Sequence, residues 1–450
     1  MDNKQKALEL GQKPVGALLW QYAIPAIVAM TATSLYNIID RASIGQIVGP
    51  DAIAGLGITF PFMNLSSAFG AAVGIGASTS ISVKLGQRDY ETAENLLGNT
   101  VSLNIIVGFL FMLVSWVFLD PILRFFGASD ITLPYAREFM EVILAGNVIT
   151  HMYFGMNAVL RSAGKPRHAM YATLFTVACN IALVFTFVWW LRWGIRGAAL
   201  ATIVSQSLAL CWQVWIFSNK KELLHLRRGI YRLKSALVRN ILSIGISPLL
   251  MQSTACVIVI AMNNQFYRYG GDMAVGAYSI SNSVVMALFM FVMGITQGMQ
   301  PIVGYNYGAK KYDRMLRCLW LSIAAATAIL TIGWAMGMLF PRQIAKVFAT
   351  DPALVDMTAH GTVINMMVLF VIGAQAIITN FFQIIGKVKI SIFLSLSRQL
   401  IILLPLAYVL PQLMGLDGVW LSMPASDLGS FLMTMPILWW YLRKLKKRNG

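Results

Sequence analysis

The feature that most constrains the fold of this chain is a series of twelve long apolar segments. Each is a window of about 20 mostly apolar residues, the length that an α-helix needs to cross the hydrocarbon core of a bilayer. Of the 450 residues, 58% are hydrophobic and only 12% are charged, which excludes a set of soluble domains. We therefore predict an all-α integral membrane protein with twelve transmembrane helices, centred near residues 28, 65, 105, 146, 180, 206, 250, 286, 328, 370, 400 and 430.

Basic residues predict how these helices are oriented. An even number of helices puts both termini on one side, and most of the 35 Lys and Arg residues fall in the termini and in the loops on that same side. Lys and Arg concentrate in cytoplasmic loops, so we expect a multi-pass protein of a bacterial plasma (inner) membrane with both termini cytoplasmic. The formal charge of +17 is then an orientation signal, and no nucleic-acid partner is expected. The opposite loops and helix ends hold Arg41, Arg124, Arg137, Arg192, Arg196, Arg268, Arg342 and Lys346.

The chain also contains an internal repeat. The loop LGQRDYETAE recurs 222 positions later as YGAKKYDRML, with Gly86 matching Gly308 and Tyr90 matching Tyr312, and three further matches, among them Pro25 with Pro248, lie at offsets of 221 to 223. We interpret this order of matches as a duplication into two six-helix bundles of parallel topology, an architecture that supports alternating access in transporters. The predicted parts are an N-terminal bundle (12–218), a cytoplasmic linker (219–235), a C-terminal bundle (236–443) and a basic tail (444–450).

One carboxylate stands at the far end of the first apolar run. Asp40 closes the otherwise uncharged stretch WQYAIPAIVAMTATSLYNIID. An ionised acid is costly in hydrocarbon and commonly marks an ion or proton pathway. Our hypothesis is that Asp40 is the coupling residue of a transporter. The alternative is that Asp40 caps the helix at the outer interface, beside Arg41, where water reaches it.

Two opposite charges are predicted to meet near the middle of the membrane. Arg398 and Asp427 each lie about eight residues into consecutive antiparallel helices from opposite sides, which is roughly 12 Å deep. We predict an ion pair between them that stabilises the C-terminal bundle. The alternative is that Asp427 is itself an acid that binds substrate or protons.

Uncharged polar and soft apolar residues complete the candidate site. Asn180 and Thr202 could supply neutral oxygens to whatever Asp40 binds, either a proton held on the acid or a sodium ion, although such residues also hold membrane helices together. A hydrogen-bonded packing role is expected for His151, the only histidine well inside an apolar run. The predicted bend of the first helix is at Pro25, and the candidate residues lining a substrate path are Asn37, Gln206, Met286 and Met290.

Several function classes find no support. The sequence has no GxxxxGK[ST] nucleotide-binding loop, no Ser/His or His/Glu arrangement at helical spacing, and four cysteines without metal-ligand spacing. We expect no enzymatic activity, no metal and no cofactor beyond the coupling ion. The expected partners are small amphipathic or cationic substrates and membrane lipids, and the expected state is a monomer.

The motifs NIIDRASIG, RSAGKPRHAM and GIRGAALAT, with the two Gly-x-x-x-Tyr loops, make the chain resemble the multidrug and toxin extrusion (MATE) family. This resemblance implies a V-shaped pair of bundles that exports organic cations in exchange for protons or sodium ions. By position, Asp40 matches the acid of helix 1 on which coupling depends, Pro25 the proline at its bend, and Asn180 and Thr202 members of the ion site. Where many relatives have a second carboxylate this chain has Val184, which favours proton over sodium coupling.

Two alternatives remain open, and a third is disfavoured. A flippase for a lipid-linked precursor would share the two-bundle plan, but we expect it to carry several deep cations where this chain has only Arg398. An exporter of a native metabolite would have the same sequence features. A major facilitator is disfavoured because its GxxxDRxGRR loop is absent from KLGQRDYETAE.

Overall fold

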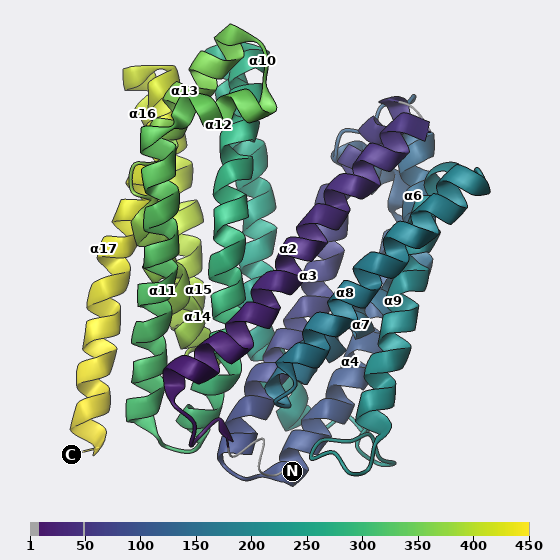
Figure 1. Ribbon diagram of the computed structural model, residues 1–450, viewed down its shortest axis with the longest axis vertical. Helices are drawn as coiled ribbons and strands as arrows, with labels where there is room; N and C mark the ends of the chain where they lie inside the picture. Colours follow the sequence, from purple (N-terminus) through teal and green to yellow (C-terminus); the bar gives the residue numbers. More distant parts are fainter. Residues whose placement is uncertain (1–8, 48–49, 450) are drawn as a thin grey trace. The chain divides into compact units, whose positions relative to one another are not determined.

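The computed structural model describes the backbone of residues 9–47 and 50–449, and the side chains of these residues except 36–54, 446, 448 and 449. The regular secondary structure of this part of the chain is entirely helical and contains no strand (Figure 1). The predicted all-α class is therefore confirmed. The helices of the first half are α2 (Val15–Ile47), α3 (Pro50–Gly86), α4 (Tyr90–Val117), α5 (Leu119–Phe125), α6 (Leu133–Ala145), α7 (Asn147–Ser162), α8 (Pro166–Val184), the π-helix η1 (Phe185–Trp190) and α9 (Gly194–Ser218).

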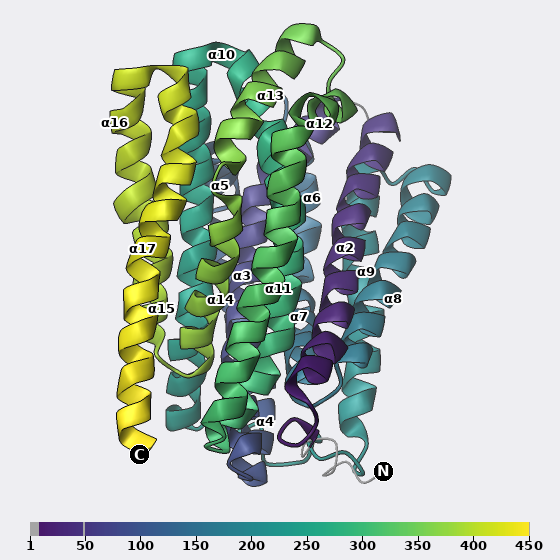
Figure 2. The same cartoon turned by 60° about the vertical axis from the view of Figure 1, so that its left-hand side comes forward.

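The second half begins with the longest helix, α10, and ends with the short helix α16 packed beside the long helix α17 (Figure 2). Its helices are α10 (Ser235–Gly308), α11 (Tyr312–Leu339), α12 (Pro341–Phe348), α13 (Pro352–Met366), α14 (Leu369–Ile384), α15 (Val388–Leu396), the π-helix η2 (Ser397–Leu403), α16 (Leu404–Met414) and α17 (Leu416–Asn449).

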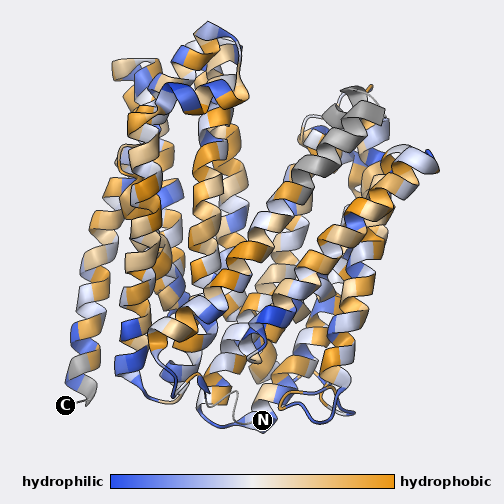
Figure 3. Cartoon of the chain, in the orientation of Figure 1, coloured by the Kyte–Doolittle hydropathy of each residue, from blue (hydrophilic) through white to orange (hydrophobic). Residues whose placement is uncertain are grey.

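The number of membrane-crossing helices depends on how bent helices are counted. Eight helices in the described part are long and apolar enough to cross a membrane, or ten if each of two bent pairs, α6 with α7 and α13 with α14, forms one span. One of the eight is α10, whose 74 residues are interrupted at Gly271 by a non-helical backbone, so it consists of two helices. The predicted total of twelve stays a prediction. Hydrophobic residues dominate the middle of the helices, whereas hydrophilic ones gather at their ends and in the loops (Figure 3).

The chain divides into two compact units. The first comprises residues 1–252 and 300–315, and the second comprises 253–299 and 316–450. The first is built on a cluster of buried Leu, Ile, Phe and Ala side chains from α3, α5, α6 and α9. In the second, Phe266 stacks on Tyr278 with ring centroids 4.5 Å apart, and Trp420 meets Phe266 edge-on at the same distance. The domain boundaries predicted from the repeat remain a prediction.

Capping residues account for where individual helices begin. Asp89 caps α4 by accepting a hydrogen bond from the backbone N–H of Thr92, and its carboxylate also pairs with Lys84 at 3.1 Å. Partial burial alone would raise the pKa of Asp89, but the hydrogen bonds from Thr92 and Lys84 outweigh it and hold the pKa below its ordinary value. Asp351 caps α13 in the same way, and proline occupies the first turn of α8, α12 and α13, where its missing N–H costs nothing.

The backbone repeats its unusual conformations at related positions. Arg88 and Lys310, 222 positions apart, both have positive φ, at 62° and 57°. Two pairs of glycines at offsets of 222 and 221 also share positive φ, namely Gly164 with Gly386 and Gly194 with Gly415. A positive φ is uncommon for Arg and Lys. Its recurrence shows that the duplicated loops keep the same turn geometry as well as the same glycines.

The ends of α3 and α10 contact each other reciprocally inside the first unit. A Cβ atom on Gly86 would overlap the carbonyl oxygen of Tyr305, and one on Gly308 would overlap that of Val83. Gly86 and Gly308 are repeat-related, and so are Val83 and Tyr305, because both pairs are 222 positions apart. The duplicated motif therefore packs against its own copy, and both glycines are required by the close approach of the two backbones.

The segment before α2 is also held by this end of α10 and by the start of α11. The side chain of Asn306 donates to the carbonyl oxygen of Leu10 at 3.0 Å, and Lys311 donates to that of Gly11 at 2.8 Å. Arg314 donates to Leu10 as well, at 3.3 Å. Leu10 itself is buried. Residues about 300 positions apart in the sequence thus lie together in the first unit.

The predicted linker between the halves packs against α4. The buried carboxylate of Glu94 lies 3.0 Å from both His225 Nδ1 and Arg227 Nε. One turn further along α4, Asn99 donates to the carbonyl oxygen of Ile230 at 3.2 Å. The linker is therefore bound to the first unit through side chains that satisfy its backbone.

Candidate functional site

The first unit contains the uncharged pair that the sequence singled out. Asn180 on α8 donates from Nδ2 to Oγ1 of Thr202 on α9 at 3.2 Å, and Thr202 donates in turn to the carbonyl oxygen of Ala198. Both side chains are buried. This arrangement leaves the Asn180 amide oxygen as an acceptor. The pair can therefore offer an oxygen to a proton donor or a cation beside it.

A second set of buried or half-buried polar side chains lies along the same helix, α9, and the helices packed against it. Gln206, one turn along α9 from Thr202, accepts a hydrogen bond from Thr150 on α7 at 2.6 Å. Asn147, which also lies on α7, accepts a hydrogen bond from the hydroxyl of Ser66 on α3 at 2.6 Å. Polar contacts thus connect α3, α7, α8 and α9 through the interior of the first unit.

His151 belongs to this network. Its ring is fully buried, and Nε2 lies 3.4 Å from the hydroxyl of Ser66. Its Nδ1 has no hydrogen-bond partner in the part of the chain that the structure describes. Gly70 and Gly108 both pack against the ring or its backbone, so there is no room for a larger side chain there. The contacts agree with the hydrogen-bonded packing role that the sequence predicts.

The helix that carries Asp40 packs against this region. α2 contacts α8 extensively and α9 to a smaller extent. The side chains of Asn37 and Asp40 lie outside the described residues, so their predicted roles stay predictions. Pro25 lies within α2 and is buried, and the helix continues through it from Val15 to Ile47.

In each half one helix continues directly into a π-helix: α8 into η1 and α15 into η2. In the first half, η1 begins five residues after Asn180. In the second half, η2 contains Arg398. π-helical turns are rare and occur frequently at functional sites, because the extra residue per turn redirects the neighbouring side chains. Both candidate polar groups are therefore next to a local distortion that no single residue in the sequence predicts.

The structure brings Arg398 and Asp427 together. Arg398 Nε donates to Asp427 Oδ1 at 2.6 Å, across from η2 to α17. The Asp427 side chain is 7% exposed and that of Arg398 is 31% exposed. Ser426 donates to the carbonyl oxygen of Arg398 at 2.7 Å, which holds the same two helices together. The carboxylate of Asp427 is therefore already paired with a cationic side chain of the protein itself.

The remaining sequence candidates lie on α10 in the second unit. Met286 is 49% exposed and Met290 is half-buried. Their predicted role in lining a substrate path stays a prediction. In the described part of the chain, no group of three His, Cys, Asp or Glu side chains is placed to hold a metal ion.

Sequence reasoning missed Ser66, Asn147 and Thr150 as members of the polar network. Each lies in a short group of polar residues inside an apolar segment, Ser66 beside Ser67 and Asn147 and Thr150 beside His151, and this grouping is the signal that could have drawn attention to them. Their partners are 56 to 85 positions away, and only the packing of the helices shows which residues meet.

The similarity to a known protein family falls on both halves of the chain. The profile of the MatE family matches residues 25–186 and again 237–409. The multidrug export protein MepA of Staphylococcus haemolyticus is 25% identical over 92% of this chain and 91% of its own length.

Two solved structures show the same fold. A MATE protein in its bent conformation superposes with a TM-score of 0.92 over 98% of both chains at 24% identity. A MOP superfamily transporter from Pyrococcus furiosus, described as having a binding pocket of reverse polarity that suggests a different function, superposes with a TM-score of 0.89 over 97% of both chains at 24% identity. These likenesses confirm the predicted fold class.

Proposed function

Because this chain belongs to the MatE family, the multidrug and toxin extrusion transporters, we propose that it is a secondary active antiporter that exports organic cations and drugs in exchange for inward protons. The observation that carries the proposal is the buried Asn180–Thr202 pair, against whose helices the Asp40-bearing helix α2 packs. In this mechanism Asp40 takes a proton from outside and loses its charge. The site then loses affinity for a cation, because a neutral acid attracts it less than a carboxylate does.

Protons suit this site better than sodium ions. Hard metal cations need several oxygen ligands, commonly including carboxylates. The pair Asn180 and Thr202 supplies neutral oxygens only, and the nearby position 184 is a buried valine. A single acid with neutral hydrogen-bonding neighbours can bind and release a proton without further ligands. The second unit adds no sodium ligand of this kind, because the carboxylate of its buried acid Asp427 is already paired with Arg398.

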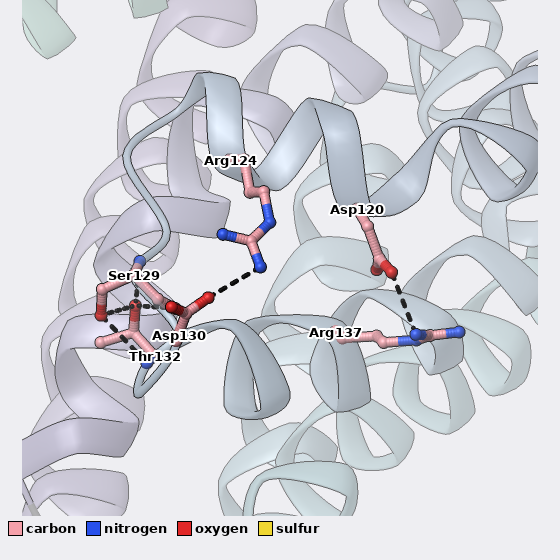
Figure 4. Close-up of polar contacts among 6 residues, drawn as sticks. All are labelled: Asp120, Arg124, Ser129, Asp130, Thr132 and Arg137. Carbon is pink, nitrogen blue, oxygen red and sulfur yellow. Dashed lines mark hydrogen bonds and ion pairs between the residues drawn. The ribbon is translucent and has the colours of Figure 1, made fainter.

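The distribution of Lys and Arg among the loops supports the proposed orientation, with both termini in the cytoplasm of a bacterial cell. Several basic residues assigned to the outer side are paired with acids there. Arg124 lies 2.8 Å from Asp130, and Arg137 lies 3.1 Å from Asp120, on either side of the α5–α6 turn (Figure 4). The loops of this side hold few of the chain's Lys and Arg residues, and the positive-inside tendency, which counts those residues in short loops, places such a side outside.

The rival flippase function is less well supported. A lipid-linked pyrophosphate would need deep cationic side chains that are free to bind it. Arg398 is the deep cation of the second unit, and Asp427 already accepts its hydrogen bond. Export of a native metabolite by the same mechanism remains compatible with every contact described here.

The proposal is tested by purified protein in liposomes with an imposed pH gradient. We expect the wild-type protein to move a fluorescent organic cation in the direction opposite to the flow of protons, and we expect the rate not to depend on sodium. Asp40→Asn should abolish this coupled movement and leave folding intact, because the amide cannot take up the proton. The control is Asp130→Asn, the same chemical change at a side chain that is 87% exposed, which should transport as wild type does.

Two results would contradict the proposal. Full coupled transport by Asp40→Asn would remove the coupling role from that residue. If the wild type moves no cation under either a proton or a sodium gradient, then the substrate is not an organic cation, and anionic or lipid-linked compounds become the better candidates.

A further inference from the structure

A cavity of about 470 Å³ opens in the first unit between the beginning of α8 and the end of α9. It is separate from the polar network around Asn180. Its lining residues are Lys165, His168, Trp215, Ile216, Ser218, Asn219 and Glu222. Cavities of this size hold small ligands or ligand head groups.

A cation and an acid lie side by side in this cavity. Lys165 Nζ is 2.6 Å from Glu222 Oε1, and the two side chains are only 11% and 18% exposed. An ammonium group has three donors and a carboxylate can accept about four hydrogen bonds, so one contact between them uses a small part of their capacity. The pair can therefore bind a phosphate at Lys165 and an ammonium group at Glu222 without separating.

The position of the cavity relative to the candidate membrane spans identifies the source of such a ligand. Lys165 directly precedes the span of residues 166–190, and Trp215 lies in the last turn of the span of residues 194–218. Trp215 is 71% exposed, as expected for an aromatic side chain at a membrane–water interface. The cavity therefore lies at the depth of the lipid head groups.

The two helices also present apolar side chains that lead away from the cavity along the membrane. Tyr171 and Phe175, four residues apart on α8, are both exposed, and so are Leu208 and Trp215, seven residues apart on α9. Residues at these spacings share one face of a helix. Acyl chains attached to a head group in the cavity could lie against these faces. Exposed basic side chains at positions 167 and 220 add attraction for a phosphate.

We propose that this cavity binds the head group of a phospholipid with a primary ammonium group, such as phosphatidylethanolamine. Lys165 would contact the phosphate, and Glu222 would accept hydrogen bonds from the ammonium group. An anionic lipid would meet the unfavourable charge of Glu222. A choline lipid could not donate to Glu222, because its nitrogen carries no hydrogen.

The first test uses full-length wild-type protein and changes only the lipid. Detergent-purified protein is titrated with phosphatidylethanolamine, its N-monomethyl and N,N-dimethyl forms, and phosphatidylcholine of identical acyl chains, and bound lipid is counted by native mass spectrometry. We expect affinity to fall with each methyl group, by roughly tenfold over the series, because hydrogen bonds to a charged acceptor are lost. Equal binding of the two end members would overturn the proposal, as would tighter binding of phosphatidylglycerol.

The second test locates the site. Glu222→Gln keeps the size of the side chain and removes its charge but leaves an amide oxygen that can still accept a weaker hydrogen bond, so the variant should lose most of the preference for phosphatidylethanolamine over phosphatidylcholine. The control Asp313→Asn, at an exposed acid in the first turn of α11, should keep the wild-type preference. If Glu222→Gln also keeps it, the site lies elsewhere and the assignment is wrong.

A third arm separates a lipid from a soluble ligand of the same chemistry. Free phosphoethanolamine at the concentration of the lipid should displace little of it, because the acyl chains contribute to binding at the apolar faces. Complete displacement would mean that the cavity serves a soluble metabolite, and the lipid assignment would fail. None of these measurements depends on transport, so the outcome is independent of the proposed antiport.

Discussion

At the residue scale, the neighbours of a buried polar side chain decide whether it is free to bind an ion or a substrate. Asp427 and Arg398 were expected to meet because of their depth, and the structure places them 2.6 Å apart. A carboxylate in that position is stabilised by its partner and need not bind a substrate. Asn180 and Thr202 differ, because their hydrogen bond leaves acceptor capacity unused next to the helix of the proposed coupling acid, Asp40.

The Arg398–Asp427 pair should matter for stability more than for coupling. Arg398→Met leaves the buried acid without its partner, and we expect a loss of about 2–4 kcal/mol, at the lower part of the usual range because Arg398 is 31% exposed. The double variant Arg398→Met/Asp427→Leu should recover most of it, because neither charge remains buried. Thermal unfolding of purified protein measures both effects. If the double variant is as stable as wild type but no longer transports, then Asp427 has a functional role after all.

At the scale of helices, small residues decide which elements can approach each other. Gly86 and Gly308 allow the ends of α3 and α10 to pack backbone against backbone, and each glycine lies against the repeat copy of its own motif. Gly57, on the same helix α3, has open space at its Cβ position. Two glycines of one helix therefore differ in role, because the packing requires one of them and not the other, and the sequence alone does not distinguish them.

Two alanine substitutions on α3 should separate these reasons. Gly86→Ala puts a methyl group into the carbonyl oxygen of Tyr305, so the two helices must shift, at an expected cost of about 1–3 kcal/mol. Gly57→Ala should be neutral or stabilising by up to about 1 kcal/mol, because alanine is the better helix former. Melting curves of the two variants, purified side by side, check the difference. Equal stability would mean that the contact of α3 with α10 contributes little.

At the scale of the whole molecule, residues distant in sequence are bound to one end of the first unit. Asn306 and Arg314 hold the segment before α2, and Glu94 and Asn99 on α4 hold the linker between the halves. Most basic residues of the chain are assigned to this same side by the sequence. The bound segments and the charge distribution together lead us to expect that this end faces the cytoplasm.

Cysteine labelling tests this orientation. In a background in which the four native cysteines are replaced, Ile131→Cys in the exposed turn before α6 should react with a membrane-impermeant maleimide in intact cells. Lys220→Cys in the linker should react only after the cells are opened. The reverse pattern would contradict cytoplasmic termini, and labelling of both positions in intact cells would contradict the assigned positions of the loops.

The sequence by itself determined the helical membrane class and the duplicated turn motif, and it predicted that Arg398 and Asp427 meet. The class and the motif are properties of single segments, because the thickness of the bilayer sets the length of an apolar run and the turn motif recurs at a constant offset. Only the tertiary structure decided that Ser66 meets Asn147, that Thr150 meets Gln206, and that Lys165 and Glu222 form a cavity. Such pairings depend on the rotation and tilt of each helix, which packing against neighbouring helices sets and no single segment encodes.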